Sequence, residues 1–157
     1  MRGTCAAAVP LWSKAIEGIC DKLGDSAHSE CPILIVDRNA ERVQLLKEIL
    51  MELRVPVDSA VRVVDRFPKP ESFAKRQQYD LIIRDAFLGT GEAATSLPQV
   101  GWRLAQPILT GRGKVVACIP YPSFEYTPQP NEIRPKRLDR QSLTHDMREC
   151  LVQIQRP

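Results

Sequence analysis

The chain has few of the residues that usually mark metal-binding or membrane-spanning proteins. Its two histidines, His28 and His145, both lie in polar surroundings, so we expect neither to act as a base or a metal ligand. No apolar run reaches the roughly 20 residues that a membrane-spanning helix needs. The N-terminus lacks the charged-then-apolar pattern of a secretory signal. We therefore expect a cytoplasmic or nuclear protein that makes no contact with membranes.

The chain also lacks a large excess of charge of either sign. The net charge is +3 over 157 residues, and the basic residues are scattered apart from one small cluster. We expect that cluster to be a solvated loop, which favours a protein or a small molecule over nucleic acid as the partner. The cluster comprises Arg134, Lys136, Arg137 and Arg140.

The cysteines show no spacing typical of metal sites. There are five of them, an odd number, and no two stand at a short ligand interval. We therefore expect reduced cysteines that pack as small apolar residues. They are Cys5, Cys20, Cys31, Cys118 and Cys150.

What the chain does contain is an alternation of helical and strand patterns. Strands are predicted at Ile33–Val36, Val61–Val64, Leu81–Ile83 and Val115–Ile119. Helices are predicted at about 10–23, 39–53, 72–76, 96–109 and 139–154, with a turn at Gly111–Gly113 and an irregular proline-rich loop at about 120–135. This order predicts a single α/β domain over residues 1–157, a Rossmann-like open and mostly parallel sheet with helices on both faces.

Each of the first three predicted strands runs directly into an aspartate. In an open parallel sheet, the ligand crevice lies outside the carboxyl ends of the strands, so three such acids can line one site. A carboxylate there can accept hydrogen bonds from both hydroxyls of a ribose. Asp37 is placed for this role, Asp65 for an adenine amino group, and Asp85 for the reacting end of a ligand. The alternative is that these aspartates are helix caps or turn residues.

From Gly3 to about Pro120 the chain resembles the class I S-adenosylmethionine-dependent methyltransferases. The resemblance implies S-adenosyl-L-methionine as the cofactor, bound through Gly3, Thr4 and the three strand-end aspartates, and direct methyl transfer to an acceptor that the sequence does not identify. The residues that carry the resemblance are Ile33–Asp37, Val63–Asp65, Tyr79–Phe87 and Leu109–Val116.

A shorter resemblance narrows the acceptor. The loop Gly89–Glu92 is similar to the acidic loop of protein arginine methyltransferases, although an aspartate stands where that subfamily uses a glutamate. It implies that Asp85 and Glu92 are the catalytic acids and that the acceptor is a protein arginine.

The chain also departs from the family pattern. Only Met1 and Arg2 precede Gly3, so the family's first strand is missing, and alanines replace glycines in the loop that would approach the cofactor. An inactive or partial copy of the enzyme therefore stays an alternative. The missing strand also predicts an open position beside Ile33–Val36, which a second copy or a partner chain would complete.

Two further alternatives remain open. The segments Ile33–Asn39 and Tyr79–Asp85 also resemble a response-regulator receiver domain, with Asp85 as the phosphoacceptor. Arg38 replaces the second acid of the receiver's metal site, so we expect no magnesium-dependent phosphorylation. The last alternative is a scaffold without catalytic activity that binds a partner chain.

Overall fold

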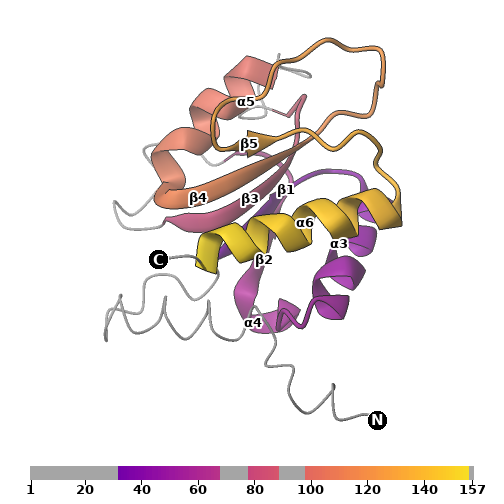
Figure 1. Cartoon of the computed structure of the whole chain (residues 1–157), viewed down its shortest axis with the longest axis vertical. Helices are drawn as coiled ribbons and strands as arrows, with labels where there is room; N and C mark the ends of the chain where they lie inside the picture. The colour runs from indigo at the N-terminus through magenta and orange to yellow at the C-terminus, as the bar shows by residue number, and fades with distance from the viewer. Residues whose placement is uncertain (1–31, 68–77, 89–97, 156–157) are drawn as a thin grey trace.

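The computed structural model describes residues 32–67, 78–88 and 98–155 (Figure 1). Its strands are β1 (Ile33–Val36), β2 (Val61–Val64), β3 (Tyr79–Asp85), β4 (Leu109–Cys118) and β5 (Glu132–Ile133). Its helices are α3 (Ala40–Glu52), α4 (Val57–Ala60), α5 (Pro98–Ala105), the 3-10 helix η2 (Gln106–Ile108) and α6 (Arg140–Gln155). The helices expected at about 10–23 and 72–76 lie outside the described residues.

The five strands form one parallel sheet in the order β2-β1-β3-β4-β5. This confirms the predicted Rossmann-like open α/β fold, and the order is that of flavodoxin-like doubly wound sheets. In β1, Ile33 pairs with Val61 on one side and with Leu81 on the other. The open position expected beside Ile33–Val36 is therefore wrong, since both neighbours of that strand are present. Self-association or a partner chain, which was expected at that position, is not tested by the strand order and stays a prediction.

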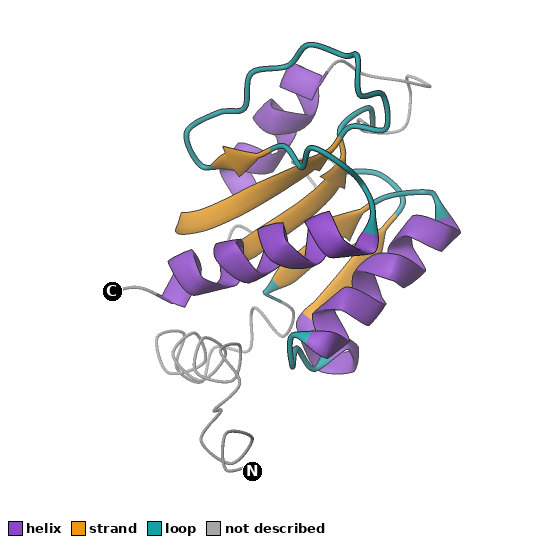
Figure 2. Cartoon of the chain, turned by 45° about the vertical axis from the view of Figure 1, so that its right-hand side comes forward, coloured by secondary structure: helices purple, strands orange, loops and turns teal. Residues whose placement is uncertain are grey.

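Helices cover both faces of the sheet (Figure 2). On one face, α3 and α6 pack against alternate strand residues such as Ile35 and Ile83. On the other face, α5 and η2 cover Leu34 and Ile82. The buried, continuously apolar strands β1 and β3 are the pattern expected of a parallel sheet with helices on both sides.

Helix α3 begins where the sequence predicts. The side chain of Asn39 accepts a hydrogen bond from the backbone N–H of Arg42, so it caps a helix end that would otherwise leave that donor unpaired. The helix then buries Leu46, Ile49 and Leu50 against the sheet. The cap fixes the first turn of α3 directly beside the end of β1.

The segment between α5 and β4 differs from the sequence prediction. The helix ends at Ala105 and continues as η2, because Pro107 offers no backbone N–H for another α-helical turn. The turn predicted at Gly111–Gly113 is wrong, since these residues belong to β4. The pairing of β4 with β3 jumps between Leu109 and Lys114, so the glycines occupy an irregularity of the strand and not a break.

The structure also tests the predictions on the cysteines, the basic cluster and the loop at about 120–135. Cys118 and Cys150 are buried free thiols, as expected, and Lys136 and Arg137 are exposed. The short strand β5 lies inside the predicted irregular loop at about 120–135 and was not expected. Within the described ranges, no helix has both the length and the apolar character to cross a membrane.

Candidate functional site

Two of the three predicted strand-end acids lie together, and an arginine joins them. Asp37 follows β1 and Asp85 ends β3, and these strands are neighbours in the sheet. Arg42, on the first turns of α3, donates from Nε to Asp37 Oδ2 at 2.5 Å and from Nη2 to Asp37 Oδ1 at 3.0 Å. The same Nη2 donates to Asp85 Oδ2 at 3.0 Å. We call Asp37, Arg42 and Asp85 the strand-end triad.

The local backbone holds the two acids in place. The backbone N–H of Asn39 donates to Asp37 Oδ1 at 2.8 Å, and that of Phe87 donates to Asp85 Oδ1 at 3.0 Å. Both oxygens of each carboxylate therefore accept hydrogen bonds. Asp37 binds the Arg42 guanidinium through both oxygens, and Asp85 binds it through one. This arrangement follows from the sequence: each acid lies two residues before the N–H that it accepts, a spacing typical of aspartate turns.

The triad lies largely out of water, which shapes its charges. The Asp37 side chain is only 1% exposed, against 14% for Arg42 and 18% for Asp85. Burial opposes the charge of Arg42, but the hydrogen bond and the negative charge of Asp37 outweigh it and raise the pKa of the guanidinium. For Asp85, burial dominates and raises the pKa of the carboxyl, although Phe87 N–H and Arg42 both favour the charged form. Arg42 is thus paired mainly with Asp37, and Asp85 is the weaker partner.

The raised pKa of Asp85 predicts a specific dependence of stability on pH. Folding shifts Asp85 toward its protonated form relative to the unfolded chain, so the contribution of Asp85 to stability is greatest below the ordinary aspartate pKa of about 3.9 and falls as pH rises through the higher folded value. We expect the free energy of unfolding of the wild type, minus that of Asp85→Asn, to decrease across this acidic range. Urea denaturation at a series of pH values measures it, and a difference that increases with pH would contradict the assignment.

The other predicted site residues do not join the triad. Asp65, at the end of β2, has a side chain that is 64% exposed and pairs with its neighbour Arg66 at 3.3 Å. Gly3, Thr4 and Glu92 lie outside the described residues. Arg42 was missed by the sequence analysis, because an arginine near the start of an amphipathic helix looks like an ordinary surface residue.

A second ionic cluster lies one residue earlier in β3. Arg84 and Glu132 have fully buried side chains, and Arg84 Nη2 donates to Glu132 Oε2 at 2.6 Å. Arg84 also donates to the backbone oxygens of Ala86 at 3.2 Å and Pro98 at 3.0 Å. The hydroxyl of Tyr126 donates to the other oxygen of Glu132. Burial first, and then this hydrogen bond, raise the pKa of Tyr126.

This second cluster attaches the proline-rich segment to the sheet. Arg84 on β3 meets Glu132 on β5, while its contact with Pro98 reaches the start of α5. Helix α5 passes so close that a Cβ added at Gly101 would lie 2.3 Å from Arg84 Nη1. Arg134 fastens the loop from its other side, donating to the backbone oxygens of Tyr121, at 3.2 Å, and Phe124.

The residues that the structure describes do not fit the implied cofactor in this conformation. S-adenosylmethionine would need Asp37 to accept hydrogen bonds from a ribose, yet Arg42 and the Asn39 N–H take both oxygens of a nearly unexposed carboxylate. A ribose could bind only if Arg42 released them. Residues 32–67, 78–88 and 98–155 also contain no group of three or more histidine, cysteine, aspartate or glutamate side chains able to hold a metal ion.

A buried thiol also lies at the end of a strand, next to the strand-end triad. Cys118 pairs with Asp85 across β4 and β3, and burial raises the pKa of its thiol to about 12. A thiol with so high a pKa is protonated at neutral pH and is a poor nucleophile.

Comparisons with family models, with curated proteins and with solved structures find no match for this chain, so any function assigned to it rests on this geometry.

Proposed function

We propose that the chain is a receiver-like interaction module that works by binding a partner and not by phosphoryl or methyl transfer at Asp85. The observation that carries this proposal is the position of Arg42, whose guanidinium lies between the carboxylates of Asp37 and Asp85. The strand order adds support, because receiver domains have the same 2-1-3-4-5 order and ligands bind at its β1/β3 switch point.

The charge of Arg42 opposes the metal that a phosphorylated receiver needs. Magnesium is usually held by one or two carboxylates, and the two acids of the triad would be the natural ligands. A divalent cation about 4 Å from a guanidinium is repelled by about 8 kcal/mol at an effective dielectric constant of 20. Arg42 therefore supplies the positive charge that the metal would otherwise bring to the two acids.

Methyl transfer remains the competing proposal, on the strength of the sequence resemblance alone. It would require Arg42 to leave Asp37 so that the carboxylate could accept the ribose of S-adenosylmethionine. Such a change breaks two charge-assisted hydrogen bonds, each worth about 1.5–3 kcal/mol. The cofactor would have to recover this free energy through its own contacts.

One experiment separates the two activities from the interaction module. We expect the intact mass of the chain to stay unchanged after incubation with acetyl phosphate and Mg²⁺, because the charge of Arg42 keeps Mg²⁺ from the two acids. A gain of one phosphoryl group that is absent in Asp85→Asn would overturn the proposal in favour of an active receiver.

The same samples test the cofactor. We expect S-adenosylhomocysteine, the demethylated cofactor, to leave the thermal unfolding temperature unchanged, because the Asp37 carboxylate is only 1% exposed and Arg42 already binds both of its oxygens. A stabilisation by this compound that is lost in Asp37→Ala would instead support the methyltransferase.

A further inference from the structure

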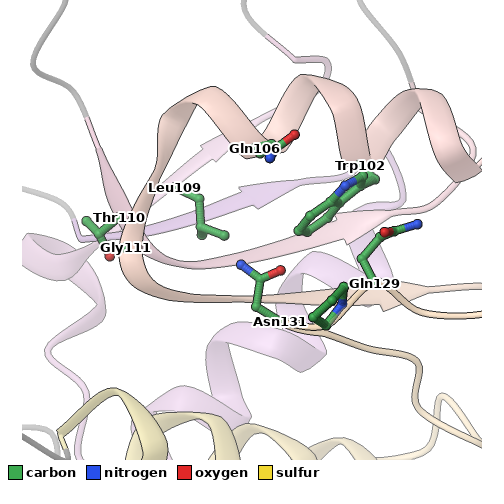
Figure 3. Close-up of a pocket in the computed structure, with 8 residues that line it drawn as sticks. Trp102, Gln106, Leu109, Thr110, Gly111, Gln129 and Asn131 are labelled. Carbon is green, nitrogen blue, oxygen red and sulfur yellow. The ribbon is translucent and has the colours of Figure 1, made fainter.

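A groove lies beside α5 and the start of β4 (Figure 3), and no residue of the strand-end triad lines it. Its volume is about 420 Å³, within the range of small-molecule sites. Trp102 and Gln106 face Gln129 and Asn131 across it, and Leu109 lies between these two walls. The walls come from distant parts of the chain: α5 and η2 form one, and the segment just before β5 forms the other.

The irregularity of β4 creates the floor of the groove. The extra residues between Leu109 and Lys114 set the start of β4 apart from regular pairing with β3. Leu109 folds over Gly113, where an added Cβ would lie 2.5 Å from the leucine side chain. Thr110, at the groove's end, donates its hydroxyl to Asp80 Oδ1 at 2.7 Å, and its oxygen can accept a hydrogen bond from a ligand.

The lining offers hydrogen bonds in both senses but no charge. Gln106, Gln129 and Asn131 each carry a carboxamide, which both donates and accepts. Of these, only the Asn131 side chain has a hydrogen bond within the described part of the chain, a long one of 3.4 Å to Gly113 O. None of the eight lining residues is charged. Such a lining suits a neutral ligand and gives nothing to neutralise a phosphate.

Arg84 holds the two walls at a fixed separation. It bonds to the backbone of Pro98, at the start of α5, and to Glu132, which directly follows the wall residue Asn131. The backbone N–H of Gln129 also donates to Glu132, at 3.3 Å. One buried ion pair therefore connects both walls, and a site with pre-set walls loses less free energy to ordering on binding.

We infer that this groove binds a neutral carbohydrate, with one sugar ring against Trp102 and its hydroxyls on the carboxamides of Gln106, Gln129 and Asn131. A sugar hydroxyl both donates and accepts, so neighbouring hydroxyls match a carboxamide. The C–H face of a sugar ring matches the apolar surface of the half-buried Trp102. A nucleotide would match the indole equally well, but its phosphates would meet no cation among the lining residues.

The test is a titration of the whole chain followed by heteronuclear NMR. The probes are cellobiose and N,N′-diacetylchitobiose, with adenosine as a neutral ligand that stacks but presents no sugar chain. We expect at least one disaccharide to shift the indole N–H of Trp102 and the side-chain amides of Asn131 and Gln129, and adenosine, with a single sugar ring for the three carboxamides, to bind more weakly.

Variants decide whether the groove is the site. Trp102→Ala should weaken disaccharide binding about tenfold or more. Trp102→Phe keeps an aromatic ring and should weaken binding less, and it serves as the test variant if Trp102→Ala fails to fold. The matched control is Tyr121→Ala, an exposed aromatic residue outside the groove, which should leave binding unchanged. The inference is overturned if neither disaccharide shifts these signals at about 20 mM, a concentration twenty times a dissociation constant of 1 mM. It is also overturned if adenosine binds more tightly than both disaccharides.

Discussion

Replacing Glu132 by alanine is expected to lower the free energy of unfolding by about 3–5 kcal/mol, because it leaves the Arg84 guanidinium buried without its counter-charge. Both side chains are fully buried, so water cannot take the place of the lost carboxylate. The loss also removes the acceptor of Tyr126 and of the Gln129 backbone N–H. Urea denaturation measures the effect, and proteolysis within residues 120–131 should accelerate in parallel.

A double variant separates the loss of the pair from the loss of one partner. Replacing Arg84 by methionine and Glu132 by leucine removes both charges and keeps most of the volume, so we expect it to cost clearly less than Glu132→Ala alone. The matched surface control is Arg140→Ala, which breaks ion pairs to Glu48 and Glu52 between exposed side chains. That variant should change stability far less. A Glu132→Ala chain as stable as the wild type would show that the ion pair does not fasten the loop.

Replacing Arg42 by methionine should cost about 3 kcal/mol, the second largest effect we expect. Methionine keeps much of the apolar stem, so the loss reports the guanidinium and not its packing. The Asp37 carboxylate would then stay buried with the Asn39 N–H as its one remaining donor among the described residues. The loss of stability in Arg42→Met should be smaller at low pH. Burial raises the pKa of Asp85, and a protonated Asp85 has no charge that Arg42 must neutralise.

Magnesium should restore part of the stability lost in this variant. With the guanidinium gone, the two acids can share a divalent cation, and binding to the folded state alone raises its stability. We expect about 10 mM Mg²⁺ to raise the unfolding temperature of Arg42→Met and to leave that of the wild type unchanged. The control is a variant that also carries Asp37→Asn, which should lose the response. A response of the wild type equal to that of Arg42→Met would contradict the role given to Arg42.

The elements of the fold could be predicted further than their arrangement. The apolar runs at Ile33–Val36 and Leu81–Ile83 predicted buried parallel strands, and the helix predicted at about 39–53 is α3. The order of the strands could not be predicted, because periodicity reports which face of an element is buried and not which strand lies beside it. The open position expected next to β1 came from the family resemblance, and the structure has β3 in that place.

The candidate site could be predicted in its acids but not in its arginines. The pattern of a strand that closes on an acid predicted Asp37 and Asp85, but it also predicted Asp65, which lies outside the triad. Arg42 meets Asp85 across 43 positions of sequence, and Arg84 meets Glu132 across 48. Such pairings depend on the packing of whole elements, and no local pattern distinguishes these arginines from solvated ones.

The adjacency of Arg84 and Asp85 makes the alignment of β3 electrostatically unique. Successive residues of a strand point to opposite faces, so Arg84 lies on the α5 side and Asp85 on the α3 side. A slip of one residue in one direction would place Asp85 against Glu132, and a slip in the other would place Arg84 against Arg42. Each misalignment thus buries two like charges together, in addition to turning the apolar residues of β3 to the wrong faces. In a uniformly apolar β3, only the misplaced apolar residues would penalise a register slip. The adjacent opposite charges of Arg84 and Asp85 add an electrostatic penalty, so they help to specify the register of this central strand.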